Sequence, residues 1–420
     1  MEHRSNSLQV EKIVGIEGYI TRTAGMGGKI KEDPDDFYVE EIADLKLSED
    51  GDYLILKVKK RNWDTLNFAR VLSNALGISQ KRVSFAGTKD KRALTVQYYA
   101  VKGVKKEDVE RIVIKDAGIE VVGYSRRRLQ LGDLLGNIFR VRVQGCGDGD
   151  IFQKTKEELE EKGTPNFFGL QRFGSVRYIT HEVGKLILQG NYREAFWVYV
   201  AKPFKGENEE IQKIRRELWE TRDPRYGLKE LPRYLRYERV LLQKLREGKT
   251  EEGALLSLPK NLKMMFVHAY QSYIFNKLLS ERLRSFGSLK EVTEGDSACY
   301  LTFKTMPTFS DCSEVSANLP RVRYLIKERI ASLALPLVGY NSELKGWSRI
   351  ALEFLHQDDL DLESFKTGHK EFSSSGSYRA ADMLIEISRI SFDGQIFEFY
   401  LPKGCYATVL LREFLKTELS

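Results

Sequence analysis

The sequence has few residues that could bind a metal or form a disulfide, and it has no long hydrophobic run. Its 420 residues include four cysteines without a CxxC pair and five histidines without an HxxxH or HxE pattern. This spacing argues against a zinc site, a redox dithiol and a metal-activated water, so we expect ordinary reduced thiols. No stretch approaches the roughly 18 consecutive apolar residues of a membrane-spanning helix. The residues concerned are Cys146, Cys299, Cys312, Cys405, His3, His181, His268, His356 and His369.

The first twenty residues are polar and lack the apolar core of a secretory signal, so we expect the protein to remain in the cytoplasm. The composition, 42% hydrophobic and 30% charged, is typical of a soluble globular protein. The length predicts roughly two to three domains. No apolar repeat suggests self-association, and we expect a monomer.

Basic residues gather early in the chain, although the net charge of +7 is modest. Three stretches combine cations with aromatic residues: 56–63 (LKVKKRNW), 80–92 (QKRVSFAGTKDKR) and 124–130 (YSRRRLQ). Cations neutralise phosphates and aromatic faces stack on unpaired bases, so this pattern favours an RNA-binding surface. A solvated basic surface without a partner is the alternative interpretation of each stretch.

The first part of the chain has the pattern of a mixed α/β domain. Strand-like alternation or β-branched residues mark 53–60, 93–103 and 137–145. The segment 64–77 predicts an amphipathic helix that begins after Asp64 and ends at Gly77, and a second helix is predicted over 151–163.

Between about residues 191 and 372 the pattern changes to long helical stretches, of which 261–287 is the clearest. A serine-rich run, SSSGS (373–377), lies where the chain would leave this region. Strand patterns return in 383–404, and the tail from 406 to 419 reads as a helix. We therefore expect a helix-rich insertion between two segments of one α/β domain.

Two short stretches have compositions that point to a functional site. In FAGTKDKRALTVQ (85–97) the carboxylate of Asp90 lies among Lys89, Lys91 and Arg92, either on a solvated surface or as an anion whose charge must be maintained. PNFFGLQRFG (165–174) places asparagine, glutamine, arginine and two glycines among three phenylalanines. A core strand would not normally contain these residues, which favours a pocket wall or, alternatively, an aromatic-anchored loop.

Together these stretches resemble the TruD family of tRNA pseudouridine synthases. GTKDKRALTVQ (87–97) is similar to the family's G-x-K-D-x-x-A-x-T-x-Q pattern, and 165–174 contains its N-x-F-G-x-Q-R-F-G pattern. KEDPDDF (31–37) and GCYATVLLRE (404–413) are weaker supporting matches. The resemblance extends from about residue 29 to the C-terminus and is least secure over 202–260.

The resemblance implies an α+β fold in which a mixed-sheet pseudouridine synthase domain carries a helix-rich α/β insertion, the TRUD domain. We expect the catalytic domain to comprise 1–189 and 376–420 and the insertion to comprise 190–375. The implied activity is isomerisation of a uridine in the D-stem region of tRNA, expected at position 13. No cofactor or metal is implied.

The resemblance also assigns individual residues. The family's catalytic aspartate falls on Asp90, and the lysine near it falls on Lys31. The pocket asparagine and phenylalanine fall on Asn166 and Phe168. We expect Phe168 to stack on uracil, and Asn166 either to bind a base edge or to orient its loop.

The residue types fit this chemistry independently of the resemblance. Pseudouridine forms when the bond between N1 of uracil and C1′ of ribose breaks and C5 joins C1′. An ionised carboxylate can attack C1′ or take the C2′ proton, and both roles stay open for Asp90. Because burial disfavours a charged carboxylate and a nearby cation favours it, we expect one cation in contact with Asp90, with Lys31 as the first candidate.

The remaining cations are candidates for RNA contacts. Lys89, Lys91 and Arg92 are expected to face phosphates, whereas Arg172 could pair with a phosphate or brace its loop. We expect the insertion to form the opposite wall of an RNA cleft, with Tyr270, Gln271 and Tyr273 as candidate lining residues, at least one of which is expected to pack in the core instead.

Two other functions remain open at this stage. An RNA-binding protein or chaperone without chemistry would use the same basic surface. A nucleoside hydrolase or glycosidase would break the same bond but usually needs a second carboxylate, for which Asp36, Glu40 and Glu41 are candidates by proximity in sequence.

Overall fold

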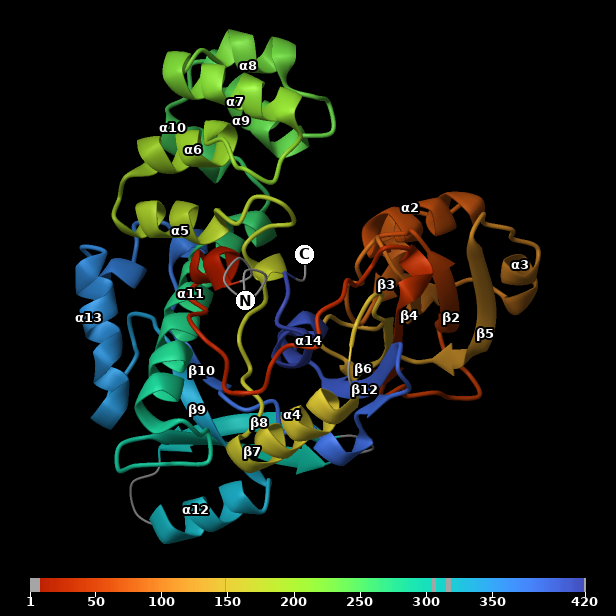
Figure 1. Ribbon diagram of the computed structural model, residues 1–420. Helices are drawn as coiled ribbons and strands as arrows, with labels where there is room; N and C mark the ends of the chain where they lie inside the picture. The colour runs from red at the N-terminus through yellow and green to blue at the C-terminus, as the bar shows by residue number, and fades with distance from the viewer. Residues whose placement is uncertain (1–7, 148, 304–306, 315–318, 419–420) are drawn as a thin grey trace.

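The computed structural model describes residues 8–147, 149–303, 307–314 and 319–418. Two β-sheets and a group of helices make up these residues (Figure 1). The larger sheet has eight strands and lies on one side of the molecule, and the helices α6 to α10 and the smaller sheet lie on the other side. The helix α14 lies between the two sides.

The larger sheet is mixed, as the resemblance predicted. Its strands follow the order β11-β12-β6-β1-β4-β2-β5, with β3 paired to β4. The pair β1 and β4 is parallel and the other pairs are antiparallel. The bounds are β1 (Phe37–Ala43), β2 (Tyr53–Arg61), β3 (Val83–Phe85), β4 (Leu94–Lys102), β5 (Ala117–Ser125), β6 (Leu134–Arg142), β11 (Ser391–Phe392) and β12 (Ile396–Pro402).

The pairing of β12 with β6 joins the two ends of the chain in one sheet. The sequence predicted that strands return near the C-terminus. The domain boundaries themselves stay a prediction, although β10 (Ser377–Ala380) pairs with β9 (Ala331–Leu337) of the smaller sheet and so lies outside the larger one.

The smaller sheet has the order β10-β9-β7-β8, and β7 (Ser297–Phe303) and β8 (Pro307–Glu314) form a hairpin. Cys299 of β7 is disulfide-bonded, and its backbone lies opposite Cys312. The expectation of four reduced thiols is therefore wrong for Cys299, because the spacing of cysteines along the chain does not show which strands pair in the fold. Cys146 and Cys405 are free thiols.

The predicted helices form where their periodicity and caps indicate. Asp64 caps α2, since its Oδ1 accepts a hydrogen bond from the Asn67 amide at 2.8 Å. Gly287 ends α11 in the left-handed conformation, with φ of 68°. The helices are α2 (Thr65–Ala75), α3 (Lys106–Glu110), α4 (Gly149–Lys162), α5 (Thr180–Leu188), α6 (Tyr192–Ala201), α7 (Glu209–Thr221), α8 (Pro224–Glu230), α9 (Arg236–Arg246), α10 (Glu251–Leu256), α11 (Lys260–Phe286), α12 (Leu319–Lys327), α13 (Ile350–Gln357) and α14 (Ala407–Leu415).

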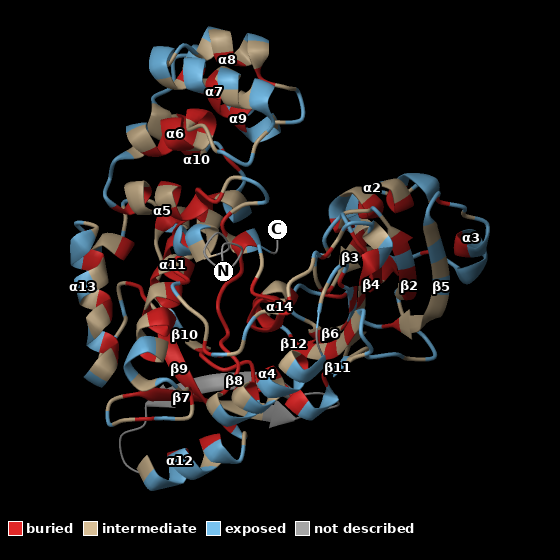
Figure 2. Ribbon diagram, in the orientation of Figure 1, coloured by how far each residue is buried: buried red, intermediate tan, exposed pale blue. Residues whose placement is uncertain are grey.

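The N-terminal segment runs beside α14 and is fixed there. The amides of Met26 and Gly27 donate to the carbonyls of Phe414 and Leu415 at 2.9 and 3.0 Å. Figure 2 shows α14 as buried, in contrast to the exposed outer faces of α2 and α3. The Lys29 amide then donates to the Gln144 carbonyl at 2.9 Å, which places the chain at Lys31 next to the end of β6 in the larger sheet.

Candidate active site

The loop between β3 and β4 presents Asp90 to solvent beside a lysine from the N-terminal segment. Lys31 Nζ donates to Asp90 Oδ2 at 3.0 Å, although the two residues are 59 positions apart in the sequence. The Asp90 side chain is 54% exposed and that of Lys31 is 12% exposed. The predicted contact between Lys31 and Asp90 is confirmed, and the Asp90 carboxylate in this contact remains partly exposed to solvent.

Lys31 has a strained backbone, with φ of 60° in the left-handed region. This conformation costs a residue other than glycine about 1–2 kcal/mol. The Lys31 ammonium also lies 4.3 Å from the ring centroid of Phe37 in β1. The ion pair and the aromatic contact hold the side chain toward Asp90 despite the strain.

A cavity of about 180 Å³ opens beside this pair. Strands β1 and β6 supply an apolar wall, and the loop before α14 and the start of that helix also line the cavity. The lining residues are Lys31, Phe37, Val39, Thr88, Lys89, Asp90, Asn137, Phe139, Gln171, Cys405, Tyr406, Ala407 and Thr408. Burial raises the pKa of the Cys405 thiol to about 12, so Cys405 is not a thiolate nucleophile at neutral pH.

Beneath Asp90, the loop is held by polar contacts to the sheet and to α2. The Lys89 ammonium lies 2.6 Å from Glu41 Oε2, and both side chains are almost fully buried. The Lys89 amide donates to Thr65 Oγ1 at 2.9 Å, and Gln97 Nε2 donates to the Gly87 carbonyl at 3.1 Å.

These contacts correct two expectations. Lys89 does not face a phosphate, because moving its ammonium away from Glu41 would leave a buried carboxylate without a cation. Glu41 is buried and paired with Lys89, so it is not available as the second catalytic carboxylate of a hydrolase.

The asparagine of the 165–174 motif braces its loop. Asn166 is 1% exposed, its Nδ2 donates to the Ala380 carbonyl at 3.0 Å, and its Oδ1 accepts from the Arg379 guanidinium at 2.7 Å. Arg379 also donates to the Gly404 carbonyl at 2.7 Å. Of the two predicted roles for Asn166, orienting the loop is the one that these contacts support.

Phe168 is packed inside the same cluster and does not line the cavity. The Arg379 guanidinium lies 4.0 Å from the centroid of the Phe168 ring, and Phe275 meets the ring edge-on at 5.4 Å. These contacts enclose much of the ring, and the expected stacking of Phe168 on uracil stays a prediction. The motif reaches the cavity through Gln171 instead.

Arg172 is held against the same cluster. Its Nε donates to Ser272 Oγ at 3.1 Å, and its guanidinium lies 5.6 Å from the Phe168 ring centroid. Burial lowers the pKa of Arg172. These contacts support the loop-bracing role for Arg172 over a phosphate contact.

Lys91 and Arg92 remain exposed at the rim of the site. Arg92 donates to the Glu32 carbonyl at 3.2 Å, next to Lys31. Their expected contacts with RNA stay a prediction. Tyr270 and Gln271 of α11, by contrast, are buried and do not form a cleft wall, because they bond to Asp358 and to the Val338 carbonyl.

Sequence reasoning missed the roles of Asn137 and Tyr406 in the cavity. Asn137 belongs to a segment that read only as a strand, and its Oδ1 is buried with no hydrogen-bond partner in the part of the chain that the structure describes. Tyr406 lies in the 404–413 match, which gave no reason to select it. Within the described residues, no three histidine, cysteine or acidic side chains form a group that could hold a metal ion.

Comparison with known proteins gives the class of the chain. The model of the family described as tRNA pseudouridine synthase D (TruD) matches residues 13–414. The chain therefore belongs to the TruD family of pseudouridine synthases, a family of isomerases, as the two motifs indicated.

Particular relatives and a solved structure agree with this assignment. The chain is 76% identical to a "probable tRNA pseudouridine synthase D" of Archaeoglobus fulgidus over 98% of this chain and all of that protein. It is 40% identical to a protein of the same name from Methanosarcina acetivorans, over 98% of this chain and 97% of that one. The crystal structure of a Methanosarcina mazei TruD aligns with a TM-score of 0.81 and 38% identity, covering 97% of this chain and 98% of that chain. Among the described residues no helix is long and apolar enough to span a membrane.

Proposed function

We propose that the protein converts a uridine of tRNA to pseudouridine and that Asp90 is the reacting group. The position implied by the family resemblance is uridine 13, in the D-stem region. The observation that carries this proposal is the Asp90–Lys31 pair at 3.0 Å, at the mouth of a cavity with an apolar wall. A carboxylate so placed can meet C1′ or C2′ of a ribose whose base lies in the cavity.

The reaction needs no group beyond this site. The N1–C1′ bond breaks, the freed uracil turns, C5 bonds to C1′, C5 releases its proton and N1 takes one up. Attack on C1′ and removal of the C2′ proton both require ionised Asp90. Its exposed carboxylate stays solvated, and the Lys31 ammonium stabilises its negative charge.

We assign Asn137 the task of holding uracil while it turns. A half-turn about the axis through N3 and C6 exchanges N1 with C5, and it leaves N3–H on the axis. An acceptor for N3–H therefore serves the base before and after the turn. Rotation of the Asn137 amide about χ2 would give its unpartnered Oδ1 this hydrogen bond.

The apolar wall limits the escape of the freed base. Phe37, Val39 and Phe139 face the cavity from the sheet, and Tyr406 faces it from the loop before α14. Because Phe168 does not line the cavity, Phe37, Phe139 and Tyr406 are the aromatic residues placed to contact the ring of uracil.

We keep the monomer expected from the sequence as the proposed form of the enzyme. The proposed substrate is tRNA, and we place the activity in the cytoplasm on that basis.

The test uses unmodified tRNA transcripts, both singly and as a mixed pool. After incubation with the protein, carbodiimide adducts map pseudouridine, and free uracil is measured in parallel. We expect one adduct in the D-stem region with wild type and none with Asp90→Asn. Released uracil would indicate a hydrolase, and tRNA binding with no product from wild type would indicate a binding protein.

A further inference from the structure

The turn before α9 and the first turn of that helix expose two tyrosines and two arginines side by side. Tyr234 is 67% exposed and Tyr237 is 46% exposed. Arg233 and Arg236 are exposed as well. We call Arg233, Tyr234, Arg236 and Tyr237 the arginine–tyrosine surface. It lies on the group of helices α6 to α10, away from the larger sheet (Figure 1).

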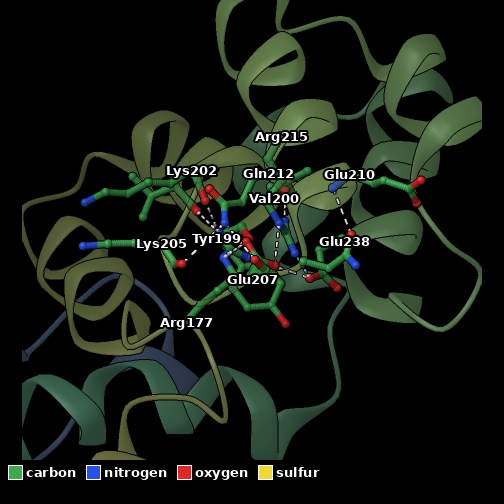
Figure 3. Close-up of polar contacts among 12 residues, drawn as sticks. Arg177, Tyr199, Val200, Lys202, Lys205, Glu207, Glu210, Gln212, Arg215 and Glu238 are labelled. Atoms are coloured by element: carbon green, nitrogen blue, oxygen red, sulfur yellow. Dashed lines mark hydrogen bonds and ion pairs between the residues drawn. The ribbon is translucent and has the colours of Figure 1, made fainter. Parts of the chain in front are cut away.

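The charge of this surface is of one sign. Within residues 231–240 the only acidic residue is Glu238, which is buried and lies 3.1 Å from the Arg215 guanidinium (Figure 3). Arg239 points inward and donates to the carbonyls of Leu228 and Leu231. What this segment presents to solvent is therefore cationic and aromatic, which suits phosphates and unpaired bases.

Beside the surface is a hollow of about 600 Å³. Its lining includes Tyr234 and Tyr237 together with Ser175 and Val176. These two residues directly follow the 165–174 motif, and only four residues separate Gln171 of the Asp90 cavity from Val176. The hollow and the active site thus share one loop.

Buried ion pairs fix the helices to this loop (Figure 3). Arg177 donates to the carbonyls of Val198, Tyr199 and Lys202 at the end of α6, at 2.8 to 3.0 Å. Arg215 binds Glu207 as well as Glu238. The tyrosines are therefore held at a set place relative to the motif loop, which reduces the entropy that a ligand would have to overcome on binding.

We propose that the arginine–tyrosine surface binds a part of the tRNA outside the Asp90 cavity. The tyrosine rings stack on unpaired bases and the two arginines contact phosphates. This inference rests on the proposed function, because it takes tRNA as the ligand. It assigns the helical group a direct role in substrate affinity and no role in the chemical step.

The test compares variants of the full-length protein on one tRNA transcript. The pair Tyr234→Ala and Tyr237→Ala removes the rings, and the pair Arg233→Gln and Arg236→Gln removes the charges. Tyr324→Ala is the matched control, since Tyr324 is 60% exposed but lies on α12, at the opposite end of the molecule (Figure 1). Kd, KM and kcat are measured over a range of salt concentrations.

We expect the tyrosine pair to raise Kd and KM about tenfold or more, with kcat unchanged. The arginine pair should also raise Kd, and it should reduce the slope of log Kd against log salt by about 1.4, the value for two phosphate contacts on a single strand. The control should behave as wild type. Unfolding temperatures near that of wild type would show that the variants are folded, since all four side chains are exposed.

Values of Kd and salt slope equal to those of wild type in both pairs would overturn the inference, and would leave the surface for a protein partner. The proposed function fails in a distinguishable way. If no variant and no wild type forms pseudouridine while the tyrosine and arginine pairs still weaken tRNA binding, the surface stands and the isomerase reaction does not.

Discussion

Replacing Asn137 with alanine tests whether this side chain binds N3–H of the reacting uracil. Its Oδ1 is buried and has no hydrogen-bond partner among the residues that the structure describes, so the substitution removes no hydrogen bond of that atom seen there. A buried unpaired acceptor costs about 1–3 kcal/mol. If uracil supplies the missing donor, Asn137→Ala should lower kcat/KM by about 5- to 150-fold, because 1.4 kcal/mol corresponds to a factor of ten.

The assay pairs the protein variant with a change in the substrate. A ligated tRNA carries either uridine or 3-methyluridine at the mapped target, and kcat/KM is measured with wild type and with Asn137→Ala. The methyl group removes N3–H, so it should cost wild type far more than it costs the variant. A methyl penalty of equal size in both enzymes would refute the assignment of Asn137.

Asn166→Ala is the matched comparison for stability. Its amide makes hydrogen bonds at both ends, so its loss should lower the free energy of unfolding by about 1–3 kcal/mol. Asn137→Ala should lower it much less. If both variants were equally destabilised, the lower activity of Asn137→Ala would have a structural explanation.

Three further outcomes follow from charges near the site. Lys31→Gly should relieve the positive-φ strain and so leave stability near that of wild type in urea unfolding. It should nevertheless slow single-turnover product formation about tenfold or more, whereas Lys31→Arg should retain more activity. Full activity of the glycine variant would contradict the pairing role of Lys31. Glu41→Gln should lower the free energy of unfolding by about 3–5 kcal/mol, because the buried Lys89 ammonium loses its counter-charge. The double variant Glu41→Gln with Lys89→Met should lose less stability, and an equal loss in the two variants would contradict this explanation. Burial lowers the pKa of Lys60 to about 8. Between about pH 8 and 10.5 the unfolded chain holds the proton and the folded chain has lost it, so the free energy of unfolding of wild type relative to Lys60→Met should rise with pH. A difference between the two proteins that does not change with pH would contradict the burial effect.

Local patterns in the sequence predicted individual elements well. Asp64, the apolar spacing of α2 and the glycine after α11 act within one or two turns, so the sequence alone defines those helices. The smaller sheet was not predicted as a sheet, because β7 and β9 are short strands that pair across a helix.

Contacts over long sequence distances were predicted only where a motif indicated them. The Lys31–Asp90 pair came from the family resemblance, whereas no pattern linked Lys89 to Glu41 of β1 or Phe168 to Arg379 of β10. A loop directs neighbouring cations in opposite directions, so composition could not separate buried Lys89 from exposed Lys91. No pattern selected Asn137, because its proposed role depends on a buried Oδ1 that lacks a partner among the described residues, and only the folded structure shows this.

The most direct measurement of the central claim is tritium release from tRNA labelled at C5 of uridine, since C5 loses its hydrogen only when it bonds to C1′. Wild type should release one tritium per modified uridine, and so should Tyr324→Ala, which changes an exposed residue of α12 far from the site. Asp90→Asn should bind tRNA as tightly as wild type and release tritium at least about a thousandfold more slowly. Release at the wild-type rate by Asp90→Asn would contradict the assignment of Asp90 as the reacting group.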